Sequence, residues 1–188
     1  MTRVRRLDAD ETKRVGAEAG VSETMAELAV FQVLFNDPPV AAALSGLLIT
    51  LLSKGRLDVR LRELVIMRIG WVTGSEYEWT QHWRVARLLG VDAEEILAVR
   101  DWRSSNRLGP AERAVLAATD ETLANGRISE PTWADCAAAL GNDDAQLVEL
   151  VIAIGNWRLF SSLLLSLDVP LEDGVDPWPP DGLRPPSH

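Results

Sequence analysis

The sequence of 188 residues contains a single cysteine, Cys136, and only two histidines, His82 and His188. One cysteine excludes an intramolecular disulfide, a Cys-x-x-Cys redox pair and a zinc site built on cysteines. Because His188 ends a proline-rich tail, a histidine that takes part in chemistry is expected to be His82. The sequence also lacks the Gly-x-Ser-x-Gly, Gly-x-Gly-x-x-Gly and P-loop motifs of three large enzyme classes.

Basic side chains and long apolar runs are also scarce. The chain has 19 Lys and Arg against 28 Asp and Glu, a net charge of -9, which argues against a general nucleic-acid binder. No apolar run approaches the ~18 residues of a membrane span, and the first residues turn acidic where a signal peptide needs an apolar stretch. We therefore expect a cytoplasmic protein that binds neither nucleic acid nor membranes.

Apolar residues recur at helical spacing, and the alternation typical of strands is absent. The pattern predicts an all-α helical bundle, with the last segment either one helix or a pair that meets at Gly155-Asn156. The expected domains are an N-terminal arm or short helix over 1–20, a helical domain over 21–169 and a proline-rich arm over 170–188. The expected helices cover residues 22–35, 40–53, 58–73, 75–89, 92–99, 110–125, 129–140 and 144–167.

Two further patterns concern packing. The segment 40–53 is apolar almost all round, which predicts burial in a core or between subunits. Glu63-Leu-Val-Ile66 is echoed by Glu149-Leu-Val-Ile152, and each glutamate is followed eight residues later by a tryptophan, Trp71 or Trp157. The echo indicates either two amphipathic helices in similar places or a duplicated helical unit.

The densest polar cluster lies between residues 60 and 87. Ser75, Glu78 and His82 have the spacing i, i+3 and i+7, which places them on one face of a helix. Glu78 and His82 could exchange a proton, since the carboxylate raises the pKa of the imidazole and burial raises that of the carboxyl. Glu63 lies among apolar residues, and a hairpin about Gly74 would bring it to His82 as a buried partner.

Other interpretations of this cluster stay open. Glu78 and His82 could be an exposed pair with no role, and Glu63, Glu78 and His82 could form a two-carboxylate, one-histidine metal site. A Ser75–His82 nucleophile pair would have to bridge about two turns, roughly 10 Å. Residues 54–87 hold seven basic and four acidic side chains, a positive region that suits a small anionic ligand or provides ion pairs on solvated faces and between subunits.

The segment Leu61-Arg62-Glu63-Leu64, continued by Trp71-Val-Thr-Gly-Ser-Glu-Tyr-Glu-Trp-Thr-Gln-His82, resembles the carboxymuconolactone decarboxylase family, which also contains the alkylhydroperoxidase D proteins. Segments downstream extend the resemblance to roughly residues 25–170. They are Leu108-Gly-Pro-Ala-Glu-Arg113, Asp120-Glu121, Trp133 and Leu147-Val-Glu-Leu-Val151. The resemblance implies an all-α fold of the alkylhydroperoxidase D type, with the motif on a helical hairpin, and a homo-oligomer that is a dimer, trimer or hexamer.

The peroxidase branch of that family has cysteines at the positions of Ser75 and Glu78, while Glu63 and His82 match its glutamate and histidine. A dithiol peroxidase needs one thiolate to attack the peroxide and a second thiol to resolve the product. Serine and glutamate do neither. The sequence therefore excludes dithiol peroxidase activity.

The decarboxylase branch lacks the cysteine pair and acts, without a metal or other cofactor, on a lactone that carries a carboxylate. By this resemblance His82 is the expected proton donor or carbonyl polariser, Glu78 its partner or proton shuttle, and Glu63 the residue that orients His82. The expected substrate contacts are Ser75, Tyr77, Trp79 and the arginines Arg62 and Arg68, with Arg60 a further choice.

Two functional hypotheses follow. The first is a cofactor-free lyase of aromatic-compound catabolism, acting by acid/base chemistry on a small carboxylated or lactone-like anion. It leaves decarboxylation, isomerisation and lactone hydrolysis open. The second is a non-catalytic oligomeric binding or scaffold protein that kept the fold after the cysteines were lost.

Overall fold

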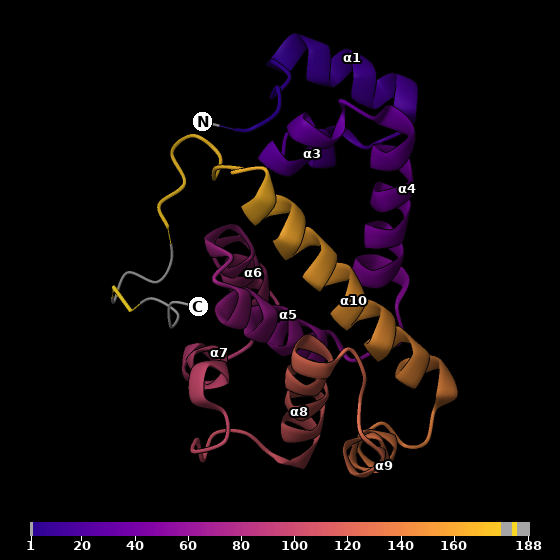
Figure 1. The fold of residues 1–188 in the computed structure, drawn as a ribbon, viewed down its shortest axis with the longest axis vertical. Coiled ribbons are helices and arrows are strands. Elements are labelled where there is room, and N and C mark those ends of the chain that lie inside the picture. The colour runs from indigo at the N-terminus through magenta and orange to yellow at the C-terminus, as the bar shows by residue number, and fades with distance from the viewer. Residues whose placement is uncertain (1, 178–181, 184–188) are drawn as a thin grey trace. The chain divides into compact units, whose positions relative to one another are not determined.

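The computed structural model describes residues 2–177 and 182–183 of the chain (Figure 1). These residues form helices joined by short loops, and no strand occurs among them. The predicted all-α class is therefore confirmed. The helices are α1 (Ala9–Ala19), α2 (Glu23–Ala26), α3 (Ala29–Leu34), α4 (Pro38–Ile49), the π-helical turn Thr50–Lys54, α5 (Val59–Thr73), α6 (Glu76–Leu88), α7 (Ala93–Ala98), the 3₁₀ turn Val99–Asp101, α8 (Pro110–Asn125), α9 (Glu130–Ala139) and α10 (Asp144–Ser166).

The described chain divides into two compact units. One contains the described residues of 1–55 and 163–176, and the other those of 56–162 and 177–188. The predicted domain boundaries at residues 20 and 169 stay predictions. The boundaries of the two compact units fall instead after residues 55, 162 and 176. Of the predicted proline-rich arm, residues 178–181 and 184–188 lie outside the described residues.

The first unit begins with a true helix. Asp8 and Glu11 form a capping box at the start of α1, and Gly20 ends the helix in the left-handed conformation. The helix predicted over 22–35 is wrong as a single element. Ser22 caps α2 as its sequence indicates, but Leu28 is extended (φ -68°, ψ 135°) and starts α3 separately. The Glu172 carboxylate accepts the N–H of Ala29 at 2.9 Å, so the break loses no backbone hydrogen bond at that residue.

The apolar helix predicted over 40–53 is α4 and the π-helical turn that follows it. Asp37 caps its N-terminus, and two prolines occupy the first turn, where no N–H is needed. Ala41 and Leu48 are buried, but Val40 and Leu47 are 45% and 36% exposed. In the single chain the helix is thus buried along one side, and burial of its exposed apolar side chains between subunits stays a prediction.

The second unit carries the core on which the polar cluster rests. Leu64 and Met67 of α5 pack with Trp79 of α6 and Leu116 of α8. The other buried members of this cluster are Ala86, Val91, Ile96, Val99, Trp102 and Leu108. This packing holds the α5–α6 hairpin in place.

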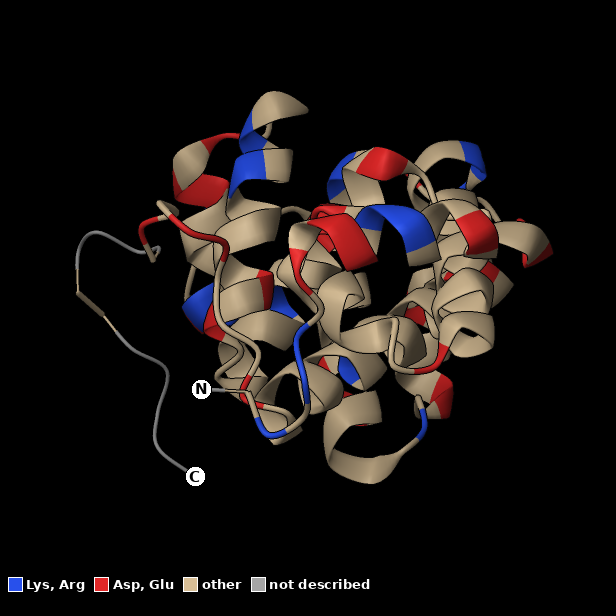
Figure 2. Cartoon of the chain, turned by 90° about the horizontal axis from the view of Figure 1, so that it is seen from above, with Lys and Arg blue, Asp and Glu red and all other residues tan. Residues whose placement is uncertain are grey.

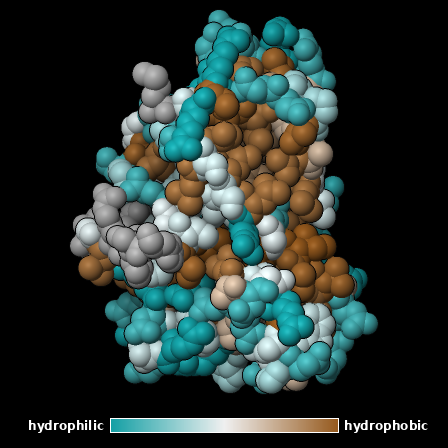
Figure 3. Space-filling view, viewed as in Figure 1, coloured by the Kyte–Doolittle hydropathy of each residue, from teal (hydrophilic) through white to brown (hydrophobic). Residues whose placement is uncertain are grey.

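Helix α10 is continuous through Gly155-Asn156, so the alternative of one helix over the region is the correct one. Of the described helices, it alone is long and apolar enough by composition to cross a membrane, yet half of its most apolar window is buried within the protein. This is the behaviour of a core helix. Apolar surface is also visible on the face shown in Figure 3, and α10 contributes the exposed side chains Val148, Val151, Ile152 and Leu159.

Candidate functional site

The hairpin between α5 and α6 turns on Gly74. This residue has φ 72°, a left-handed conformation that favours glycine. Its N–H donates to Trp71 O at 3.2 Å, and the N–H of Ser75 donates to Gly70 O at 2.9 Å, which closes α5 with a Schellman-type end. Ser75 then caps α6, because its Oγ accepts the N–H of Glu78 at 3.4 Å.

This arrangement changes what Glu78 does. Ser75-Glu-Tyr-Glu78 has the spacing of a capping box, in which the glutamate would accept the N–H of the capping serine. That N–H is already donated to Gly70 O. The Glu78 carboxylate instead lies 3.4 Å from His82 Nε2, one turn along α6.

Gly70 sets how closely the two helices approach. A Cβ at this position would meet the backbone nitrogen of Trp79 at 3.1 Å and Glu78 Cβ at 3.5 Å. A side chain here would require the backbone of α6 to move away by a few tenths of an ångström. The glycine therefore lets α6 approach α5 closely enough for the polar side chains of the two helices to meet.

A chain of hydrogen bonds links three of these side chains. Arg62 donates to Glu63 Oε1 from Nη2 at 2.9 Å and from Nε at 3.0 Å. The other carboxylate oxygen, Oε2, lies 2.7 Å from His82 Nδ1. Both oxygens of Glu63 are thus engaged, and Glu63 is fully buried. Glu63 thus contacts the imidazole, as the hairpin about Gly74 predicts, and its role in orienting the ring stays a prediction.

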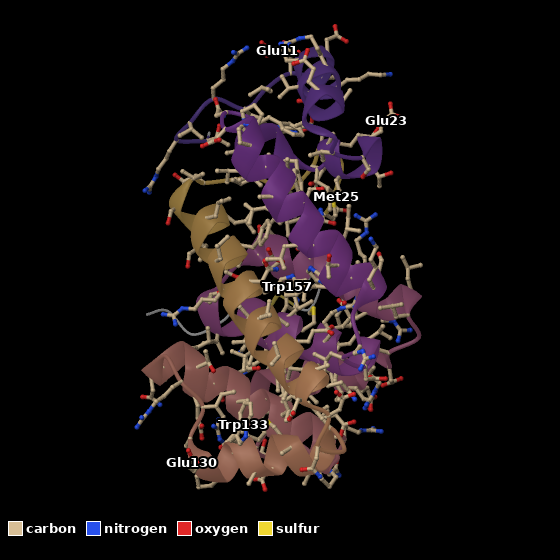
Figure 4. The ribbon with its side chains drawn as sticks, turned by 90° about the vertical axis from the view of Figure 1, so that its right-hand side faces the viewer. Glu11, Glu23, Met25, Glu130, Trp133 and Trp157 are labelled. Carbon is tan, nitrogen blue, oxygen red and sulfur yellow. The ribbon has the colours of Figure 1, made fainter. Side chains whose placement is uncertain are left out.

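The second nitrogen of His82 meets helix α10. Leu150, Ile154 and Trp157 form the buried stripe of this helix, and Trp157 projects from it (Figure 4). The indole Nε1 of Trp157 donates to His82 Nε2 at 3.0 Å. The two rings meet edge to face, with centroids 5.7 Å apart and an interplanar angle of 85°.

Burial and charge shift the pKa values of these groups. Burial would raise the pKa of Glu63, but His82 and Arg62 together hold it below the ordinary value. Burial would lower the pKa of His82, but the Glu63 carboxylate and then Glu78 raise it above the ordinary value. Burial raises the pKa of Glu78 to about 7, although His82 opposes the shift. Glu63 therefore stays ionised, while His82 and Glu78 can exchange a proton near neutral pH.

The structure brings Glu63, Ser75, Glu78 and His82 together, as the hairpin model predicts. Tyr77 is buried beside them on α6, with 7% of its surface exposed. Trp79 faces the apolar core, where its ring lies 5.3 Å from that of Trp71. Its predicted contact with substrate has no support from this placement.

The predicted positive region is largely neutralised. Arg68 donates to Asp120 at 2.6 and 3.0 Å and to the carbonyls of Val99 and Arg100. Arg60 pairs with Glu95 and Glu112. Acidic and basic residues are interspersed over the helices (Figure 2). Of the three arginines considered for a substrate carboxylate, Arg62 alone adjoins the cluster, since Arg60 and Arg68 are held by other carboxylates.

Sequence reasoning missed Trp157 as a member of the site. The only signal was the weak repeat, in which Trp157 corresponds to Trp71. The two halves of the repeat differ in what they do, because Glu149 accepts the backbone N–H of Arg56 at 2.6 Å rather than a histidine. Two amphipathic helices in similar places therefore describe the echo better than two equivalent sites.

The described side chains also bear on metal binding and on thiol chemistry. Within residues 2–177 and 182–183, no group of three or more His, Cys, Asp or Glu is arranged to hold a metal ion. Cys136 is buried, donates to Ala114 O at 3.4 Å, and burial raises the pKa of its thiol to about 11. Such a thiol is protonated at neutral pH and is a poor nucleophile.

Comparison with known proteins agrees with this geometry. Residues 38–121, which include the hairpin and its four polar residues, match the model of the Carboxymuconolactone decarboxylase family. No curated protein matches the chain in sequence.

Solved structures share the fold at low identity. The alkylhydroperoxidase AhpD core, an uncharacterized peroxidase-related protein from Ralstonia eutropha JMP134, is 16% identical with a TM-score of 0.71, over 94% of this chain and 98% of that one. A protein of unknown function from Agrobacterium tumefaciens, a putative antioxidant defence protein AhpD, is 21% identical with a TM-score of 0.66, over 72% and 92%. The debrominase Bmp8 in its apo form is 17% identical with a TM-score of 0.69, over 92% and 91%.

These likenesses establish the fold, and the family match covers the segment that carries the site. The resemblance drawn from Glu63, Ser75, Glu78 and His82 is thereby confirmed. Residues 38–121 thus match the carboxymuconolactone decarboxylase family model, in a chain that has an alkylhydroperoxidase D-like fold and no Cys-x-x-Cys pair.

Proposed function

We propose that this protein is an acid/base enzyme that acts, without a thiol or added cofactor, on a small carboxylated or lactone-like organic anion. The observation that carries the proposal is the buried series Glu63–His82–Glu78, with Nδ1 and Nε2 of one imidazole facing two carboxylates at 2.7 and 3.4 Å. A group whose pKa lies near the working pH serves best as a general acid or base. Glu78, with a pKa of about 7, meets that condition.

The roles follow from what each group can do. Glu63 remains ionised and holds His82 in one orientation, so it is a positioning residue. In a decarboxylation, the bond to the carboxylate carbon breaks, CO₂ leaves, and the electron pair moves onto the lactone carbonyl. The resulting dienolate takes a proton on carbon from Glu78, and His82 relays a replacement proton to Glu78. Arg62 supplies the positive charge nearest to the cluster.

A second candidate is a non-catalytic oligomeric binding or scaffold protein. The observation that favours it is burial, because the side chains of His82, Glu78 and Glu63 are only 11%, 6% and 0% exposed. A hollow of about 690 Å³ on this unit is lined by α8 and α9 residues such as Ala114 and Ala138, and not by the cluster.

Turnover separates the two candidates. The purified chain would be incubated with 4-carboxymuconolactone in the absence of thiols and added metal, and lactone product and CO₂ would be followed. Product formation that is lost in Glu78→Gln and in His82→Ala, but kept in Glu130→Gln, would support the enzyme. Glu130 is an exposed glutamate at the start of α9 (Figure 4). No turnover, or full turnover in both variants, would reject the assigned roles.

A further inference from the structure

We infer that Trp157 is a positioning residue that keeps the proton shared by His82 and Glu78 on the Glu78 carboxyl. Its meaning for catalysis rests on the proposed function, whereas the proton location itself does not. Glu78 rather than His82 would then be the acid that protonates a substrate carbon. Neither the family match nor the fold likeness assigns any role to this tryptophan.

The inference begins with donor and acceptor chemistry. The indole nitrogen of tryptophan only donates, and it has no lone pair to accept. At 3.0 Å, the Trp157 N–H makes a normal hydrogen bond to His82 Nε2 only if that nitrogen carries no proton. The remaining ring proton then lies on Nδ1, where Glu63 Oε2 accepts it at 2.7 Å. The neutral tautomer protonated on Nδ1 therefore satisfies the contacts of both Trp157 and Glu63.

The alternative arrangement places two donors against each other. If the proton moved from Glu78 to His82, an Nε2–H would face the Trp157 N–H, and the indole would lose its acceptor. Trp157 is 1% exposed, so water does not readily replace that acceptor. An unsatisfied buried donor is unfavourable, and the hydrogen bond from Trp157 thus opposes protonation of the imidazole.

The charged groups around His82 and Glu78 do not by themselves decide which of the two holds the shared proton. Arg62 and Glu63 face it from α5 and Glu78 from α6, while α10 contributes the uncharged Trp157. With Arg62 and Glu63 ionised, the cluster has the same net charge whether the proton lies on Glu78 or on His82. Glu63 favours a protonated His82, whereas burial and the Trp157 N–H favour two neutral groups. Removing the N–H should therefore tip the pair toward a protonated His82.

The test is a titration of the His82 ring by ¹⁵N NMR. Histidine-labelled protein gives ring signals from His82 and His188, and His188→Gln identifies those of His82. In the unaltered chain we expect the neutral form of the ring to carry its proton on Nδ1. In Trp157→Phe, which keeps an aromatic ring but removes the donor, we expect the pKa of His82 to rise by about one unit.

Trp79→Phe is the matched control. Trp79 is also buried, but its Nε1 has no hydrogen-bond partner among the described residues. This substitution should leave the His82 titration where it was, although it also exchanges a buried indole for a phenyl ring. An equal shift in both variants would overturn the inference, because it would trace the effect to altered packing.

Two further results would also overturn it. One is an unchanged His82 titration in a folded Trp157→Phe protein. The other is an unaltered chain whose neutral His82 carries its proton on Nε2, a measurement that holds even if the variant does not fold. A ring protonated on Nδ1 together with no turnover of any lactone would reject the proposed function and leave the inference standing.

If the enzyme is active, its pH profile gives an independent readout. The limb of kcat/KM that reports the loss of the shared proton should move in Trp157→Phe. A merely structural role would lower kcat/KM by the same factor at every pH, and that result would contradict a positioning role.

Discussion

Helix α5 carries two ionic clusters that differ in kind. Toward the 3₁₀ turn and α8, Arg68 binds Asp120, which also accepts from Trp102 Nε1 at 3.0 Å and from Arg103 at 2.8 Å. Burial would raise the pKa of Asp120, but these donors, Arg68 first, hold it below the ordinary value. In the other cluster, the Glu63 carboxylate contacts His82 Nδ1, and the Glu78 carboxylate lies near His82 Nε2.

The difference lies in whether a proton can move. Every partner of Asp120 is a permanent donor, so the carboxylate stays ionised at neutral pH and the cluster only holds α5 against its neighbours. His82 and Glu78 are both titratable, and burial removes the water that would otherwise fix their charge states. The half-buried cluster is thus a structural ion pair, and the buried one is a candidate acid/base pair.

The largest expected effect is on turnover. If the Glu63–His82–Glu78 cluster is the reactive one, Glu78→Gln and His82→Ala should each lower kcat on the identified substrate by roughly 10²–10⁴-fold, the usual contribution of a positioned acid or base. Steady-state kinetics with Glu130→Gln as the control measures this. A kcat within twofold of the unaltered enzyme in either variant would contradict the assignment of Glu63–His82–Glu78 as the reactive cluster.

A substitution in the Arg68–Asp120 cluster should change stability alone. Asp120→Asn leaves the half-buried Arg68 without its counter-charge, which should lower the free energy of unfolding by about 3 kcal/mol. Urea unfolding measures this loss. The ¹⁵N titration of His82 should remain unchanged, and a shift of that titration would mean that the two clusters are coupled through α5.

The pH dependence of stability should also separate the clusters. The pKa of Glu78 is raised from 4.5 to about 7 in the folded protein, so the folded state holds this proton more tightly than the unfolded state. Its contribution is complete below pH 4.5 and is lost as the pH rises to about 7, by about 3 kcal/mol in all.

Glu78→Gln removes that titration. The variant should match the unaltered chain in stability at pH 4.5 and exceed it by up to about 3 kcal/mol at pH 8, measured by urea unfolding at both pH values. The raised pKa of His82 acts in the same direction, since its stabilisation too is lost as the pH rises. A difference that does not change between pH 4.5 and 8 would contradict the buried, protonated Glu78.

A smaller effect is expected from the spacing of the helices. Gly70→Ala would place a methyl group 3.1 Å from the backbone nitrogen of Trp79, and overpacking of this kind costs about 1–3 kcal/mol. Thermal unfolding measures the loss. Because the strain lies between Glu63 and Glu78 along the hairpin, we expect kcat to fall in this variant but not in Gly46→Ala, where nothing lies within 4 Å of the added Cβ.

The smallest effect is expected from Arg103, the exposed member of the Arg68–Asp120 cluster. Arg103 reaches Asp120 at 2.8 Å, but its side chain is 62% exposed. Arg103→Ala should therefore change the unfolding free energy by less than about 1 kcal/mol. A loss as large as that of Asp120→Asn would show that Arg103, and not Arg68, holds the carboxylate.

Much of the site could be predicted because it lies on one hairpin. The spacing of Ser75, Glu78 and His82 places them on one helical face, and Gly74 marks the turn that returns Glu63 to His82. Local rules sufficed there. They failed at residues 27–28, where the apolar pattern continues but the chain leaves the helix and Glu172, 143 residues away, accepts the N–H of Ala29.

The sequence by itself determined the all-helical class, the hairpin, its buried glutamate–histidine pair and the absence of a dithiol, because each depends on residue type and short-range spacing. Only the tertiary structure decided which arginines are neutralised and that Trp157 occupies the second nitrogen of the imidazole. Those contacts join residues separated by up to 75 positions. Their partners are chosen by packing, which no local pattern encodes.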